Sequence, residues 1–132
     1  MTRLVGLARA AGFLGVLGII VLSLVPGAVR PHTGLPGAVE HFLAYALTAS
    51  ALSFGFRPLA YRIVFAAGLA LLAGLMEILQ HFVPGRHPAA ADAFVSSLGG
   101  LFGLALGSLL RELAVQAYRK YHNFGEAPGP LQ

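Results

Sequence analysis

Polar side chains occur at helical spacing within otherwise apolar stretches of this chain. The candidate ligand-binding residues are His41, Tyr45, Glu77, Gln80, His81, Arg86, Asp92 and Ser96. A histidine titrates near neutral pH and can transfer protons together with a carboxylate, so His41, Glu77 and Asp92 are also candidate catalytic residues. The sequence does not name a bond on which they would act. Whether the protein is an enzyme therefore stays open at this point.

The spacing of these residues gives less support to metal binding or to a known enzyme motif. Glu77 and His81 form an i, i+4 pair, but such pairs are common and the HExxH arrangement is absent. Zinc could be held by His41, His81, Glu77 or Asp92, but the spacing supports it weakly, so we predict no bound metal ion and no cofactor. The chain has no cysteine, no Ser–His–Asp order and no glycine-rich phosphate loop, which leaves no familiar enzyme motif.

Structural roles are open for the same residues. Arg86 lies between Glu77 and Asp92 in the sequence, and we expect it to pair with these carboxylates and fix the loop to the helices. That triad fits an architectural role as well as a functional one. His41 has a structural alternative in a hydrogen bond to Glu77, and Asp92 has one in capping the helix that follows Pro88.

Composition identifies the environment in which these residues lie. The chain has 132 residues, of which 57% are hydrophobic and 11% are charged, and its mean hydropathy is +0.76. Soluble domains carry about 25% charged residues. So few charges cannot cover a small domain with polar surface, and an integral membrane protein is expected.

Predominantly apolar stretches long enough to cross a bilayer as helices occur four times. They are residues 10–29, 36–56, 63–83 and 89–110. We predict an all-α fold, a four-helix transmembrane bundle with short Pro/Gly loops. Outside it we expect a cytoplasmic N-terminal segment, a cytoplasmic interfacial helix and a disordered tail, at residues 1–9, 111–124 and 125–132 respectively.

The basic residues predict an orientation. Four spans place seven of the nine lysines and arginines on one side, namely Arg3, Arg9, Arg57, Arg62, Arg111, Arg119 and Lys120. Arg30 and Arg86 fall on the other side. The positive-inside rule then puts both termini in the cytoplasm. The expected location of the protein is the cell (inner) membrane. The positive charge is explained by topology and anionic lipid, so no nucleic-acid partner is expected.

Small residues recur on one face of several spans, as in tightly packed membrane helices. These stripes are Gly99, Gly103 and Gly107 in the fourth span, Ala66, Ala70, Ala73 and Gly74 in the third, and Ala8, Gly12 and Gly15 in the first. The polar residues continue the stripes and fall near the outer end of the spans. Because charge inside the hydrocarbon is costly, this shared face and depth indicate a site.

Several short segments resemble the VanZ-like family of small membrane proteins. They are His41-Phe-Leu-Ala-Tyr45, Glu77-Ile-Leu-Gln80, Gly85-Arg86, Asp92, Leu98-Gly99-Gly100 and the SLVPG run at Ser23–Gly27. The resemblance covers roughly residues 20–107, and its order and spacing are more specific than any single motif. The family often has Asn at the position of Ser96 and a basic residue at that of Ala38, which puts anion binding by the second span in doubt.

The resemblance implies a link to teicoplanin resistance and names no reaction. It favours a protein whose outer cluster binds an amphiphile: a lipid headgroup, a lipid-linked cell-wall precursor or a lipoglycopeptide. The alternative is a membrane enzyme acting on a lipid-linked substrate, with His41 as base and Glu77 or Asp92 as its partner. A proton-coupled transporter ranks third, since the ionisable groups stop at one end. The sequence does not fix the oligomeric state.

Overall fold

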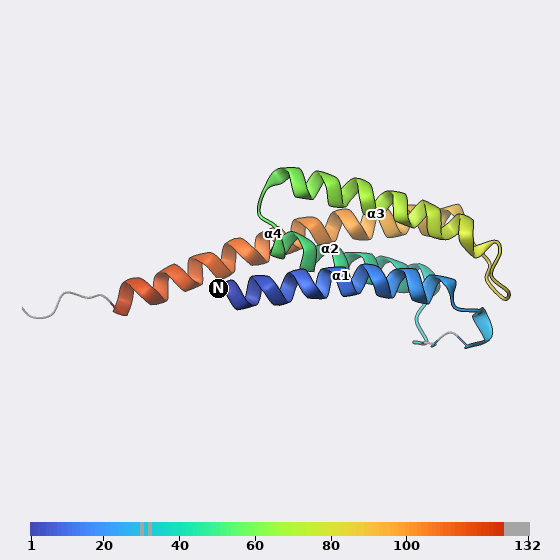
Figure 1. The fold of residues 1–132 in the computed structure, drawn as a ribbon, viewed down its shortest axis with the longest axis horizontal. Coiled ribbons are helices and arrows are strands. Elements are labelled where there is room, and N and C mark those ends of the chain that lie inside the picture. The colour runs from blue at the N-terminus through green and yellow to red at the C-terminus, as the bar shows by residue number, and fades with distance from the viewer. Residues whose placement is uncertain (30, 32, 126–132) are drawn as a thin grey trace, which may run out of the picture.

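The chain is all-helical over the residues that the computed structural model describes, which are 1–29, 31 and 33–125. The elements in order are α1 (Thr2–Leu24), the short 3-10 helix η1 (Gly27–Val29), α2 (Gly37–Gly55), α3 (Leu59–Gln80) and α4 (Ala90–Gly125). Figure 1 shows the four α-helices running side by side. The predicted helical fold class is confirmed. Arg30, His32 and all of the predicted tail except its first residue lie outside the described residues.

Prolines set most helix boundaries and explain where the predicted spans were misplaced. Pro36 and Pro58 each precede the first residue of a helix, where a missing N–H has no cost. α1 ends at Leu24, five residues before the predicted 29, because Val25 precedes Pro26 and adopts an extended conformation. α3 begins at Leu59, before the predicted 63, since the turn at Pro58 starts it earlier.

The order of the helices in space differs from their order in sequence. α2 packs between α1 and α4, and α3 packs mainly on α4. The end of α1, the start of α2, the end of α3 and the start of α4 meet at one end of the bundle, which we call the polar end (Figure 1). The start of α1 lies at the opposite end, toward which α4 also runs.

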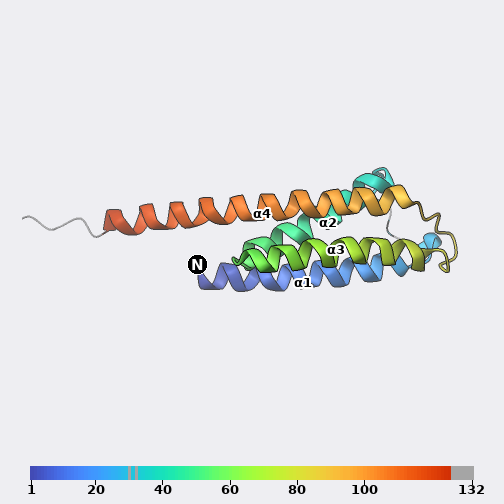
Figure 2. The same ribbon diagram turned by 90° about the horizontal axis from the view of Figure 1, so that it is seen from above.

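α4 is longer than a single membrane crossing. Its 36 residues correspond to about 54 Å, against a hydrocarbon core of about 30 Å. The helix continues without interruption through Arg111, where a separate interfacial helix was predicted, and projects beyond the other helices (Figure 2). The predicted segment 111–124 is therefore helical but belongs to α4.

Within the described part of the chain, three helices are long and apolar enough to cross a membrane: α1, α3 and the Ala90–Tyr121 part of α4. The predicted second span, α2, is not among them. Its polar residues bind α4 instead of facing outward: the buried Ser53 hydroxyl donates to the Leu104 carbonyl at 2.8 Å, and Ser50 donates to the Gly103 carbonyl at 3.0 Å. A helix that buries its polar residues against a neighbour tolerates a lower mean hydropathy than one surrounded by lipid.

The glycine stripe of α4 makes the closest helix contact in the bundle. A β-carbon at Gly99, Gly103 or Gly107 would overlap a backbone carbonyl of α2, at Phe42, Ala46 and Ser50 respectively. The predicted packing role of this stripe is confirmed, and Gly12 and Gly15 of α1 likewise contact Leu52 and Thr48.

The predicted stripe of α3 is only partly confirmed. Ala73 is buried, whereas Ala70 is exposed and a β-carbon at Gly74 would meet no atom within 4 Å. The contact of α3 with α4 is smaller than that of α2 with α4, so small residues beside it have no close neighbour.

Arginines at the other end of the bundle close the C-terminus of α2. Arg9 of α1 donates to the Gly55 carbonyl at 3.0 Å and lies over the Phe56 ring, while Arg111 of α4 donates to the Phe54 carbonyl. Cations at a helix C-terminus satisfy its unpaired carbonyls and complement its dipole. These residues, predicted only as topological charges, therefore also join three helices.

Candidate functional site

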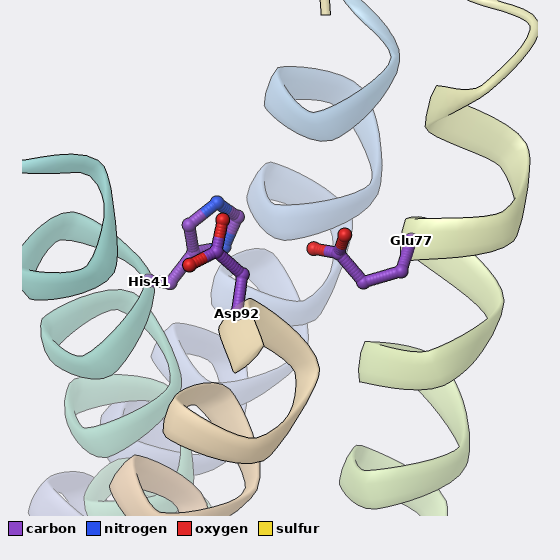
Figure 3. A group of neighbouring side chains, drawn as sticks. All are labelled: His41, Glu77 and Asp92. Atoms are coloured by element: carbon purple, nitrogen blue, oxygen red, sulfur yellow. The ribbon is translucent and has the colours of Figure 1, made fainter. Parts of the chain in front are cut away.

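Three ionisable side chains from three different helices meet at the polar end. His41 comes from the first turns of α2, Glu77 from the end of α3 and Asp92 from the first turn of α4. One imidazole nitrogen and one carboxylate oxygen from each acid all lie within 4.8 Å of one another, and Figure 3 shows the three side chains converging. We call this the His41–Glu77–Asp92 cluster.

Glu77 is the most enclosed member of the cluster. Only 8% of its surface is exposed, and one of its oxygens accepts a hydrogen bond from the Ala89 N–H at 2.8 Å, directly before α4. The bond links α3 to the start of α4 and fixes the carboxylate. The side chains whose charges act on Glu77 are Asp92, His41 and His81, so two acids share one small region with histidines.

Arg86 contacts the end of α1, a partner that the sequence did not predict. Its guanidinium donates to the Val25 carbonyl at 3.0 Å and to the Leu22 carbonyl, both at the end of α1. Gln80 makes a similar bond from α3, donating to the Ser23 carbonyl at 3.3 Å. Because α1 ends abruptly before Pro26, these donors satisfy carbonyls that would otherwise lack helical partners.

The other predicted site residues surround the cluster at different depths. Tyr45 and Ser96, each 2% exposed, lie one helical turn further from the polar end than His41 and Asp92. His81 is exposed, and its Nδ1 lies 2.9 Å from the Glu77 carbonyl oxygen of its own helix. The polar residues therefore form two groups. Tyr45 and Ser96 belong with the cluster, whereas Arg86 and Gln80 each donate hydrogen bonds to the end of α1.

A cavity of about 480 Å³ lies beside the cluster, between α1 and α2. Its inner part is lined by Gly15, Gly18, Ile19, Leu47 and Thr48, and its part nearest the polar end by Glu40, His41, Gln80 and Arg86. His41 belongs both to the cavity wall and to the cluster. A ligand in the cavity would therefore contact a residue of the cluster.

Sequence reasoning missed the wall of the cavity that α1 provides. Gly12 and Gly15 press against α2, but a β-carbon at Gly18 would meet no atom within 4 Å. The predicted stripe of Ala8, Gly12 and Gly15 did not include Gly18, which lies three residues further along α1 and lines the cavity. Glu40, which accepts a hydrogen bond from Thr33 at the mouth, was likewise not among the predicted site residues.

No family model, no curated protein and no solved structure matches this chain. The function is accordingly inferred from the geometry of the cluster and the cavity.

Proposed function

We propose that the protein is a multi-pass membrane protein that binds an amphiphile in the cavity between α1 and α2. The observation that carries this proposal is the gradient of polarity along the cavity. Charged side chains gather at one end, and the other end is lined mainly by glycine and aliphatic residues, with Thr48 as its polar member. A molecule with a polar headgroup and an apolar chain matches both halves.

The size of the cavity fits such a ligand. Its α1 wall extends from Gly15 to Ser23, which is about 12 Å at 1.5 Å per residue. Its volume, about 480 Å³, falls within the range of about 300–1,000 Å³ typical of small-molecule pockets. This is room for a headgroup together with the first part of an acyl chain.

The rim of the cavity gives a lipid chain a route in from the side. Leu22, Leu43 and Leu47 line the cavity and are 51%, 42% and 70% exposed. Exposed leucines on a membrane helix face acyl chains, so the apolar half of the cavity would be continuous with the bilayer. An amphiphile could then enter laterally without leaving the membrane.

The proposed topology places the polar end at the outer leaflet of the inner membrane. α2 would cross the membrane as a fourth helix inside the bundle, with both termini in the cytoplasm where Arg3, Arg9 and Arg119 lie. The resemblance to the VanZ-like family agrees with this placement. The ligand would then be a phospholipid, a lipid-linked cell-wall precursor or a lipoglycopeptide that presents its headgroup at the outer face.

Filling the cavity should abolish binding without disturbing the fold. Gly18→Leu adds a branched side chain where the backbone leaves open space, so we expect the protein to fold while at least about tenfold less amphiphile is bound. Binding is measured with a fluorescent phosphatidylglycerol analogue on protein purified in detergent, and co-purifying lipids are quantified by mass spectrometry.

Gly68→Leu is the matched control, because Gly68 lies on α3 away from the cavity and also has no atom within 4 Å of an added β-carbon. It should bind as the unmodified protein does. Equal binding by Gly18→Leu and the unmodified protein would rule out the cavity as the binding site.

A second candidate is a membrane enzyme acting on the bound amphiphile. The observation that favours it is that His41 lines the cavity and also belongs to the cluster. His41 would act as general base, with Glu77 or Asp92 orienting it. Turnover of a lipid-linked precursor that is lost in His41→Gln would support this candidate, and tight binding without turnover would support binding alone.

A further inference from the structure

We propose that the His41–Glu77–Asp92 cluster is a binding site for a first-row divalent transition-metal ion such as Zn²⁺. The proposal goes beyond amphiphile binding and does not depend on it. One imidazole nitrogen and two carboxylate oxygens form a donor set that such ions accept, whereas Mg²⁺ and Ca²⁺ prefer oxygen donors alone.

The geometry supports coordination of one ion by all three residues. The three donor atoms lie within 4.8 Å of one another, and Figure 3 shows the carboxylates and the ring turned toward a common region. Ligand distances of about 2.0–2.2 Å require the donors to approach a little further. Because they come from three helices that already pack together, small side-chain rotations are enough.

A hydrogen bond from the backbone orients the Glu77 carboxylate, as is common for carboxylates that bind metal ions. One of its oxygens accepts the Ala89 N–H at 2.8 Å, which leaves the other for an ion. Such hydrogen bonds from neighbouring groups orient metal ligands and tune their affinity. The bond therefore gives Glu77 one defined direction toward Asp92 and His41.

Charge within the cluster also favours a cation. Glu77 is buried, and Asp92 is only partly exposed beside it. Two carboxylates at this separation repel each other when both are ionised, and burial increases that cost. His41 is the histidine within the cluster and offsets at most one negative charge, whereas a divalent ion balances both acids.

An independent observation at Tyr45 points to the same place. Its hydroxyl is buried, the residue is 2% exposed, and no hydrogen-bond partner for it is found among the described residues. Side chains on a helix lean toward its N-terminus, so Tyr45 leans toward the turn that carries His41. The hydroxyl also lies within electrostatic range of Glu77. A phenol there can hydrogen-bond to a ligand carboxylate or to a water on the ion.

This assignment replaces the prediction of no metal ion. That prediction gave little weight to zinc at His41, His81, Glu77 or Asp92, because the HExxH arrangement, which places ligands on one helix, is absent. Here each ligand lies on a different helix, so no short sequence motif identifies the site.

The test uses the full chain purified in detergent, stripped with a chelator and titrated with Zn²⁺ alone. We expect one zinc per chain by elemental analysis after desalting. His41→Ala and Asp92→Asn should each weaken binding at least about tenfold, since loss even of an outer-shell partner costs about 10–100-fold. Tyr45→Phe should weaken binding about tenfold, whereas a purely packing role for Tyr45 would leave the affinity unchanged.

His81→Ala is the matched control, because this exposed histidine lies one turn from Glu77 and outside the cluster. It should bind zinc as the unmodified protein does. X-ray absorption on the zinc-loaded, unmodified chain should show one imidazole and otherwise oxygen ligands, a result that does not depend on any variant folding. Zinc without imidazole scattering, equal loss in His81→Ala and His41→Ala, or equally tight Mg²⁺ binding would overturn the proposal.

Discussion

Gly103→Ala should destabilise the bundle by about 1–3 kcal/mol, the usual cost of forcing extra atoms into a packed interface. The added β-carbon would overlap the carbonyl oxygen of Ala46, and it would lie 2.8 Å from the carbonyl carbon and 2.9 Å from the α-carbon of that residue. These atoms belong to the backbone of α2, so no side-chain rotation relieves the overlap. α2 and α4 would have to move apart along their whole contact.

The consequences extend to the site, because His41 and Asp92 lie on the two helices that would separate. Unfolding of the purified protein, titrated from a mild detergent into a denaturing one, measures the loss. Gly68→Ala, the same change where an added β-carbon meets no atom within 4 Å, should leave stability unchanged or slightly higher. A Gly103→Ala protein as stable as the Gly68→Ala control would show that α2 and α4 are not this close.

Arg86→Ala should release the end of α1. Hydrogen bonds from charged donors are worth about 1.5–3 kcal/mol, and Arg86 donates to both the Val25 and Leu22 carbonyls. We expect an overall loss of stability of about 1.5–3 kcal/mol. Amphiphile binding should also weaken, because α1 forms one wall of the cavity.

Hydrogen–deuterium exchange followed by mass spectrometry locates this effect. Exchange should rise in peptides that cover residues 20–29 and change little in α4. Arg86→Lys should restore part of the protection, since a lysine keeps one charged donor. His87→Ala, at the exposed neighbouring position, is the control. Unchanged exchange at residues 20–29 in Arg86→Ala would contradict the role of Arg86 at the end of α1.

The roles of the arginines show where sequence reasoning was limited. A charge between two acids in the sequence, as Arg86 is, predicted an ion pair, yet the hydrogen bonds described for its guanidinium go to α1. Sequence order alone suggests partners that are close along the chain. The unpaired carbonyls at the end of α1 become near partners only after α1 packs beside the loop that carries Arg86.

The sequence by itself determined the helical class, the apolar character of α1, α3 and α4, and the end of the bundle at which polar residues gather. It also identified the glycines that let α4 approach α2. These properties follow from hydropathy, proline position and the period of a helix, which act over a few residues.

The tertiary structure decided which helices are neighbours and therefore what the polar residues form. Packing of α2 between α1 and α4 buried Ser53, opened the cavity at Gly18 and brought His41 to Glu77 and Asp92. The physical reason is that each of these features joins residues from different helices. Their distances depend on helix order and rotation, which the spacing along one chain does not specify.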